Sequence, residues 1–493
     1  MHSRAIALAV LLVVSAAGQA RTPNIVFILA DDLGSADLSC CGQKKFRTPN
    51  IDRIANEGMR LTRHYSGCNV CAPSRCVLMS GLHTGHSYIR DNRQAAGFPE
   101  GQTPVPADSL PLPELLKKNG YTIGGFGKWG LGPVGSTGDP LKHGFDRWFG
   151  YNCQAVAHNY YPEKLWDNDR PFPLKNPKFA SNQKLPDGSD PNDPKSYERY
   201  SGTEYAPDVI GEKARDFLRE NKARPFLLYY PTTVPHLALQ APADSLKEFI
   251  GKFPEVPYPG GKGYLPQMHP RAAYAAMITR MDRDVGRLLD LLRELKLDEN
   301  TIVVFTSDNG PLYDKLGGTD DVFFDSAGGL RGRKGSYYEG GFRVPCLVRW
   351  PGRIAAGSTS DRVTGFEDWL PTLFELAGLE KHVPPKRDGI SFAPTLLGKN
   401  QEPREFLYRE APGYGGQQCV IAGEWKGYRK NLHPPAKAKN DAPGALEVYH
   451  LATDPNETTD VAKKRPEIAA KLQALLDREH VKSNLFPIRA LDK

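Results

Sequence analysis

The sequence predicts an α/β fold: a large, mostly parallel or mixed sheet with helices on both faces, followed by a smaller C-terminal α+β subdomain. Through most of the chain, apolar runs bounded by turn residues alternate with segments of helical periodicity. This alternation is typical of parallel strands covered by helices. From about Cys419 onward the runs become short and strand-like and are followed by one helical segment, which indicates a separate unit.

The predicted elements of the large sheet follow in order. The mainly apolar run 24–30 predicts a buried strand, and 51–57 predicts a helix that Thr48-Pro49 opens and Gly58 closes. The same rhythm then occurs three more times. Predicted helices at 112–119, 208–220 and 272–297 precede predicted strands at 121–125, 225–230 and 301–306.

Two other regions differ from this pattern in composition and in the length of their apolar runs. Residues 160–205 are rich in Pro, Asn, Asp and Lys, so we expect an irregular surface insertion of the kind that often shapes pockets. Short runs at 420–422, 425–429 and 446–450 and a helix from 466 to about 478 predict the C-terminal subdomain. We therefore expect a signal peptide at 1–20, a main domain at 21–415 and a subdomain at 416–493.

The N-terminus has the order of a secretory signal: a basic start, an apolar run at 5–14, and small residues ending at Ala20. The run is too short to span a bilayer. An N-terminal anchor helix is the alternative, but we expect an exported, periplasmic or secreted protein without an integral membrane segment. Eight cysteines in 493 residues are compatible with an oxidising compartment and too few for a disulfide scaffold.

The formal net charge of +7 suits an anionic ligand. Lys and Arg are nevertheless scattered, with no basic stripe interleaved with aromatic residues, so the sequence argues against a nucleic-acid partner.

Acidic and amide side chains directly follow two predicted strands. Asp31 and Asp32 follow the strand at 24–30, and Asp308 and Asn309 follow the strand at 301–306. The carboxyl ends of strands in an open parallel sheet form the edge where ligands bind. Each pair alone could simply begin a turn. Together they offer three carboxylates and an amide oxygen, which suit Ca²⁺ or Mg²⁺.

Cys71 begins the frame C-x-P-S-R, which ends at Arg75. Pro73 and the apolar spacing after it place Cys71 near a helix N-terminus, where backbone N–H groups favour negative charge. Arg75 lies one turn further on the same face. This setting predicts an activated nucleophile, whereas a cysteine in a secreted protein is more commonly a disulfide partner or an inert thiol.

Three more polar side chains lie in comparable places. Lys128 follows the predicted strand at 121–125, His236 follows the strand at 225–230, and Lys334 lies in a glycine-rich loop. Taken singly, a lysine is usually a surface charge and a histidine is often structural. Their repeated position after strands favours a common site.

Together these segments resemble the type I, formylglycine-dependent sulfatases of the alkaline phosphatase superfamily. The overall sequence pattern is similar to that of arylsulfatase-like bacterial glycan sulfatases. The likeness runs from about Asn24 to Pro466. Its landmarks are 24–34, 48–52, 71–75, 80–85, 127–129, 235–236, 306–310 and 334–345. The ordered set is far more specific than any one of its members.

The resemblance implies an alkaline-phosphatase-like fold, a catalytic sulfatase domain at 21–415 and hydrolysis of a sulfate monoester. It implies that a formylglycine-generating maturase converts Cys71, whose hydrated aldehyde attacks sulfur and forms a sulfo-enzyme intermediate. The implied metal is Ca²⁺, with Mg²⁺ as the other candidate. The implied ligands are Asp31, Asp32, Asp308, Asn309 and the modified Cys71. Arg75 would stabilise the ionised diol, Lys128 and Lys334 would hold the sulfate, and His236 is our candidate for protonating the leaving alcohol.

Gly130 departs from the family pattern, because many members carry a histidine there. His158 is a candidate replacement and a candidate substrate-binding residue. We expect exo-action on a sulfated carbohydrate, with galactose or N-acetylgalactosamine sulfate favoured by the resemblance. The alternatives are a formylglycine-dependent phosphonate or phosphodiester hydrolase and, because of Gly130, an impaired sulfoglycan-binding protein.

Overall fold

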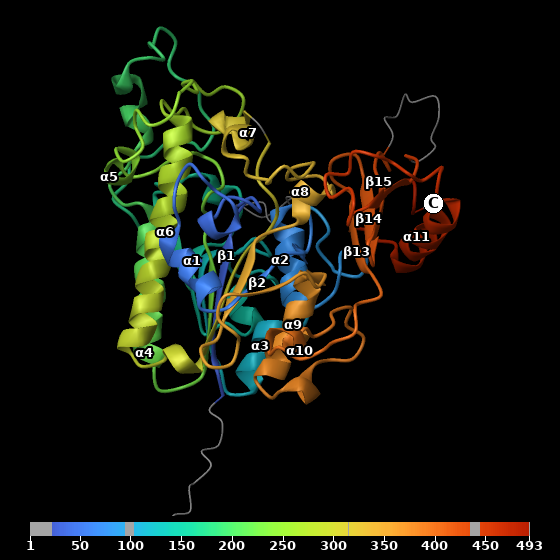
Figure 1. Ribbon diagram of the computed structural model, residues 1–493. Helices are drawn as coiled ribbons and strands as arrows, with labels where there is room; N and C mark the ends of the chain where they lie inside the picture. The colour runs from blue at the N-terminus through green and yellow to red at the C-terminus, as the bar shows by residue number, and fades with distance from the viewer. Residues whose placement is uncertain (1–21, 94–102, 314, 434–443, 493) are drawn as a thin grey trace, which may run out of the picture.

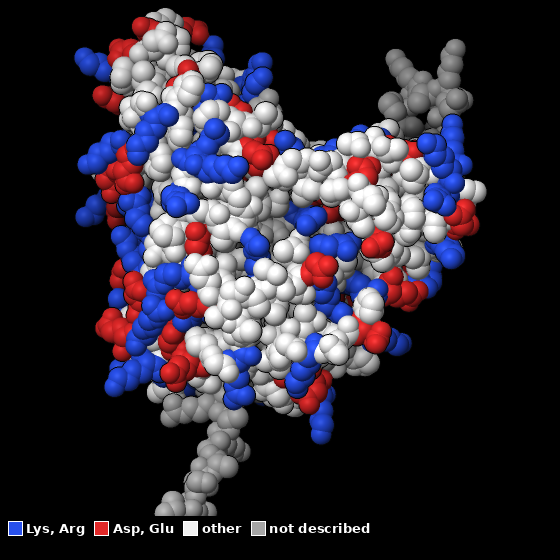
Figure 2. Space-filling view, in the orientation of Figure 1, with Lys and Arg blue, Asp and Glu red and all other residues white. Residues whose placement is uncertain are grey.

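The computed structural model describes residues 22–93, 103–313, 315–433 and 444–492 (Figure 1). The predicted signal peptide at 1–20 lies outside the described residues. Within those ranges, every helix is too short or too polar to cross a lipid bilayer. On the face seen in Figure 2, Lys and Arg are interspersed with Asp and Glu.

A ten-stranded mixed sheet forms the centre of the main body, which confirms the predicted fold class. β1 (Asn24–Ala30) lies between β8 (Phe226–Pro231) and β9 (Thr301–Ser307), parallel to both. β4 (Thr122–Lys128) and β5 (Arg147–Tyr151) continue the parallel part beyond β8. On the other side, antiparallel β10 (Cys346–Arg349) pairs with β9 and β2 (Met59–Leu61), and β11 (Ser358–Ser360) ends the sheet.

Helices cover both faces of this sheet because its central strands bury side chains on both sides (Figure 1). Val26, Ile28 and Ala30 of β1 belong to one apolar cluster, and Ile25, Phe27 and Leu29 belong to the other. The first face is covered by α1 (Pro49–Asn56), α4 (Ala206–Asn221) and α6 (Pro270–Glu294). The second is covered by α2 (Cys71–Ser80), α3 (Pro111–Lys118), α9 (Trp369–Leu376) and α10 (Ala393–Leu396).

The shorter elements are α5 (Ala243–Leu246), α7 (Asp321–Phe324), α8 (Glu339–Phe342) and the pair β3 (His64–Tyr65) and β12 (Thr364–Gly365).

The expectation that 160–205 is irregular is wrong at its start. β6 (Lys164–Asp167) and β7 (Arg170–Pro173) form an antiparallel hairpin that extends the large sheet beyond β5. β7 contains two prolines, which a strand tolerates only at a sheet edge, and these prolines hide the strand pattern in the sequence. The 3₁₀ helix Pro194–Tyr200 is the regular element in the later part of this region.

The C-terminal unit is a four-stranded antiparallel sheet with one helix, shown in orange and red in Figure 1. Its strands are β13 (Leu407–Ala411), β14 (Gln417–Ala422), β15 (Trp425–Arg429) and β16 (Glu447–His450). α11 (Pro466–Glu479) packs on one face, and the other face packs against Tyr65 and Phe342 of the main body. The sheet thus begins at Leu407, before position 416.

Buried ion pairs join the two units. Arg409 of β13 is fully buried, and its Nη2 lies 2.6 Å from Oε2 of Glu367, which precedes α9. The Arg409 Nε also donates to the carbonyl oxygen of Ser66 at 2.8 Å. Arg404 pairs with the neighbouring Asp368 at 2.7 Å and with Glu367 at 3.3 Å. Each of these buried charges therefore depends on its partner.

Replacing Glu367 with Ala should lower the free energy of unfolding by about 3–5 kcal/mol, because the change leaves Arg409 buried and uncompensated. Urea unfolding measures this loss. As a control, Asp216→Ala removes one of the two acidic partners of the exposed Arg219 and should leave the unfolding midpoint unchanged. Equal stability of the Glu367→Ala variant and the wild type would contradict the assignment.

Candidate active site

The polar residues predicted from strand ends lie together at one edge of the large sheet. Asp31 and Asp32 directly follow β1, and Asp308 directly follows β9, the adjacent parallel strand. The backbone joins the two pairs, because the Asp308 N–H donates to the Ala30 carbonyl at 3.0 Å and the Asp32 N–H donates to Oδ1 of Asp308 at 3.2 Å. Lys128 is the last residue of β4, so it reaches the same edge.

Cys71 is the first residue of α2 and is buried beneath this edge. Its Sγ lies 3.4 Å from Oδ1 of Asp31 and 4.0 Å from Oδ1 of Asp32. The Nζ of Lys334 is 3.3 Å from the same sulfur. The structure therefore brings the C-x-P-S-R cysteine into contact with both a predicted metal ligand and a predicted sulfate-binding lysine.

The prediction that the Cys71 thiol itself is activated is wrong. Burial raises its pKa, and the charges of Asp308 and Asp31 raise it further, while Lys128 and Lys334 only partly oppose them. The guanidinium of Arg75 turns to the carboxylates, with its Nη2 2.9 Å from Oδ2 of Asp308 and 3.4 Å from Oδ2 of Asp31. Burial and the acidic surroundings thus outweigh the effect of the helix N-terminus on the Cys71 pKa.

Carboxylates and cations alternate in the cluster. The Nζ of Lys128 is 2.6 Å from Oδ2 of Asp31, and the Nζ of Lys334 is 2.7 Å from Oδ1 of Asp32. Burial acts to raise the pKa of Asp31, but Lys128 and the other nearby cations outweigh it and hold that pKa well below its usual range. Burial raises the pKa of Asp308 to about 6, and the charge of Asp31 adds to this effect. Each buried charge has a partner of opposite sign, as burial requires.

The donor set fits a hard divalent cation. Asn309 donates from Nδ2 to Oδ1 of Asp32 at 2.6 Å, yet its own Oδ1 is buried without a hydrogen-bond partner. A buried oxygen of this kind is rare unless a ligand uses it. Potential ligand atoms of Asp31, Asp32, Cys71 and His236 lie within 4.8 Å of one another. With the carboxylate of Asp308 and the amide oxygen of Asn309 included, oxygen atoms are the majority of the donors, which favours Ca²⁺ or Mg²⁺ over softer metals.

His236 faces the cluster through Nε2. Its Nδ1 lies 2.7 Å from the Leu237 carbonyl oxygen, and since a carbonyl only accepts, Nδ1 carries the hydrogen. The Nε2 lies 3.4 Å from Oδ2 of Asp32. Burial lowers the pKa of His236, and the charges of Lys334 and Lys128 lower it further. His158 stacks on His236, with ring centroids 4.7 Å apart and an interplanar angle of 8°.

The backbone conformation at position 130 and the neighbouring Gln154 side chain explain why a glycine is found there. The sequence did not point to Gln154. Its φ of 87° is a conformation that favours glycine. A Cβ there would lie 3.0 Å from Cγ of Gln154. Gln154 donates to Oδ1 of Asn92 at 3.1 Å, and the Ala72 N–H donates to the same oxygen at 3.0 Å. Gln154 and Asn92 lie in loops without a recognisable motif, so no sequence signal identified them.

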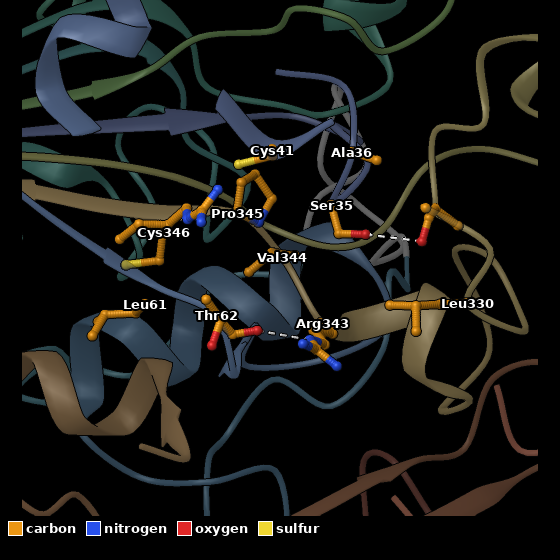
Figure 3. A pocket seen from close by; sticks show the side chains of 13 residues that line it. Ser35, Ala36, Cys41, Leu61, Thr62, Leu330, Arg343, Val344, Pro345 and Cys346 are labelled. Atoms are coloured by element: carbon orange, nitrogen blue, oxygen red, sulfur yellow. Dashed lines mark hydrogen bonds between the residues drawn. The ribbon is translucent and has the colours of Figure 1, made fainter. Parts of the chain in front are cut away.

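A separate pocket of about 220 Å³ is lined by residues of the segments 35–41, 60–62, 327–330 and 343–346 (Figure 3). Ser35, Cys41, Arg343 and Cys346 are among its lining residues. Two hydrogen bonds fix its walls, from Ser35 Oγ to the Ala327 carbonyl at 3.1 Å and from Arg343 Nε to the Thr62 carbonyl at 2.8 Å. None of the predicted site residues lines it, so it is distinct from the Cys71 cluster.

A cysteine held among carboxylates, lysines and an arginine at the carboxyl edge of an α/β sheet defines a hydrolase site for an anionic ester. The chain belongs to the sulfatase family, whose model matches residues 23–379, and it is a sulfuric ester hydrolase. A second model, described as the C-terminal part of N-sulphoglucosamine sulphohydrolase, matches residues 333–482.

Relatives and solved structures agree with this membership. N-acetylgalactosamine-6-sulfatase of Rattus norvegicus is 33% identical over 431 residues, covering 84% of this chain and 72% of the relative. N-acetylgalactosamine-6-O-sulfatase of Bacteroides thetaiotaomicron is 29% identical over 520 residues and covers 92% of each chain. The crystal structure of Ps i-CgsB superposes with a TM-score of 0.72 at 26% identity, covering 94% of each chain. A 6S-sulfatase structure from work on glycosaminoglycan metabolism by Bacteroides thetaiotaomicron gives 0.70 at 27%, covering 93% of this chain and 99% of the other.

In unconverted protein treated with a chelator, alkylation of Cys71 by iodoacetamide should keep accelerating with pH up to about pH 10, because its raised pKa keeps the thiolate fraction low. Peptide mass spectrometry measures the rate at each pH. In urea-unfolded protein the rate should level off close to the ordinary cysteine pKa of about 8.5. A plateau at the same pH in folded protein would contradict the raised pKa.

Proposed function

We propose that the protein hydrolyses sulfate monoesters of carbohydrates, with Cys71 converted by a maturase to formylglycine as the nucleophile. The observation that carries this proposal is the position of the Cys71 Sγ, 3.3 Å from Lys334 Nζ and 3.4 Å from Asp31 Oδ1. A nucleophile at that point lies between the groups suited to bind sulfate and those suited to bind a cation.

The Lys and Arg side chains of the site suit the negative charge of a sulfate ester. Lys128 and Lys334 would bind the sulfate oxygens, which otherwise repel a nucleophile. Arg75, held by Asp308, would stabilise the ionised oxygen of the hydrated aldehyde. That oxygen attacks sulfur as the bond to the alcohol breaks. The other hydroxyl of the diol would then give its proton to water and expel sulfate as the carbon–oxygen bond to the sulfate group breaks, regenerating the aldehyde.

His236 is the proposed proton donor to the leaving alcohol. Because Nδ1–H is held by the Leu237 carbonyl, Nε2 is the nitrogen that would take up a proton and pass it to the alcohol. A Ca²⁺ bound by Asp31, Asp32, Asp308 and Asn309, with Mg²⁺ as the other candidate, would supply positive charge beside the nucleophile. The paired cations and carboxylates favour catalysis over an impaired binding protein. The departure at Gly130 leaves no gap, because Gln154 fills the space next to it.

The substrate is proposed to be a sulfated galactose or N-acetylgalactosamine unit, cleaved by exo-action. Two relatives named above carry N-acetylgalactosamine-6-sulfate activity in their names. The apolar N-terminal run supports export to the periplasm or the cell exterior, where such glycans are accessible.

Protein coexpressed with a formylglycine-generating maturase should lose about 18 Da in the peptide that contains Cys71, because thiol becomes aldehyde. It should release sulfate from N-acetylgalactosamine 6-sulfate faster than it cleaves aryl phosphonates or phosphodiesters. Ion chromatography measures the sulfate released.

The control for that experiment is Cys71→Ala, which should show neither the mass loss nor turnover. Complete conversion with turnover of phosphodiesters alone would favour the phosphonate or phosphodiester hydrolase. A peptide that stays wholly thiol in active enzyme would refute the formylglycine proposal.

Asn309→Ala should weaken Ca²⁺ binding at least about ten-fold, because it removes the buried Oδ1. Titration calorimetry on chelator-treated protein measures the affinity, and the rise of the melting temperature with added Ca²⁺ gives a second readout. The matched control is Asn152→Ala, which removes a buried asparagine just after β5 and outside the proposed ligands. Equal loss in both variants would contradict a direct role for Asn309.

A further inference from the structure

A tyrosine of the C-terminal subdomain lies against the residue that follows Lys334. Tyr414 belongs to the loop 412–416, which joins β13 to β14. Gly335 has a φ of 84°, and a Cβ built there would lie 2.6 Å from the Tyr414 ring, whose atoms are also its next nearest neighbours. The absence of a side chain at Gly335 therefore lets the Tyr414 ring pack directly on the backbone beside Lys334.

Hydrogen bonds fix this loop to the Lys334 segment. Gln417 donates from Nε2 to the Gly335 carbonyl at 2.7 Å and to the Tyr414 carbonyl at 3.4 Å. The Oε1 of Gln417 accepts from the Tyr337 N–H at 3.3 Å. The Tyr337 hydroxyl in turn donates to the Glu410 carbonyl of β13 at 2.9 Å. The loop that carries the Tyr414 ring is thus fixed before any ligand arrives, which reduces the entropy lost on binding.

The Tyr414 ring is nevertheless 53% exposed, unlike most large apolar side chains of the structure. Tyr313, a few residues after Asn309, supports it with ring centroids 6.2 Å apart. A third tyrosine, Tyr264, lies beside His236 at 6.1 Å between centroids. Aromatic rings therefore lie next to the two groups, Lys334 and His236, that both reach Asp32.

We propose that Tyr414, supported by Tyr313, is the stacking surface for the sugar ring of the sulfated substrate. A pyranose presents C–H bonds on one face and hydroxyl groups around its edge. A tyrosine ring offers a matching apolar face with few rotatable bonds to immobilise. Because the Tyr414 ring packs on the backbone next to Lys334, we place the sugar ring against it when Lys128 and Lys334 hold the sulfate. The C-terminal subdomain would then contribute directly to substrate choice. The inference rests on the proposed function and adds its sugar-binding residue.

Tyr414→Ala should raise the KM for a sulfated monosaccharide about ten-fold and change kcat by less than about three-fold. Stacking strengthens substrate binding and has little effect on the chemical step at sulfur. The inhibition constant of inorganic sulfate should stay unchanged, because sulfate occupies the lysines and not the ring. Tyr414→Phe keeps the ring and should keep the KM.

The control is Tyr88→Ala, which removes a tyrosine that is 43% exposed and outside the residues placed at the site. It should leave both constants unchanged. The inference would be overturned, while the proposed function stands, if Tyr414→Ala left the KM unchanged. It would also be overturned if the variant weakened inhibition by sulfate as much as it raised the KM. Failure of the converted wild type to cleave any sulfated sugar would instead overturn the proposed function, and this inference with it.

Discussion

The structure depends on the balance of buried charge at the carboxyl edge of the large sheet. Three carboxylates, Asp31, Asp32 and Asp308, have almost no contact with solvent, and burial of an unpaired carboxylate would cost several kcal/mol. They are tolerated because Lys128, Lys334 and Arg75 are directed at them. The groups that make the site chemically useful are therefore also the groups that make it stable enough to exist.

This balance is possible because of strand order. β1 and β9 are parallel neighbours in matched register, with Ala30 opposite Ser307, so the residues that follow them emerge side by side. β8 and β4 bring His236 and Lys128 to the same edge. Cys71 and Lys334 come from segments that pack over the edge. The parallel strands fix the carboxylates, and the covering segments bring Cys71 and Lys334 to them.

Much of this arrangement could be predicted because strand ends leave a pattern in the sequence. The predicted strands at 24–30 and 301–306 agree closely with β1 and β9, and their acidic pairs lie together as expected. Asn92, Gln154 and Tyr414 could not be found this way, since each acts from a loop whose position is set by distant packing. Prolines concealed β7, and the pKa of Cys71 depends on charges that are adjacent only in the folded chain.

The central place of β1 also has a kinetic consequence. β1 is synthesised before its partners β8 and β9, which are about two hundred or more residues further along the chain. Until β9 has been synthesised, β1 lacks one of its two neighbours, and its unpaired edge can pair with other chains. Folding of this sheet is consequently dominated by non-local contacts and should be slow, with the carboxylate edge assembled only after most of the chain has left the ribosome.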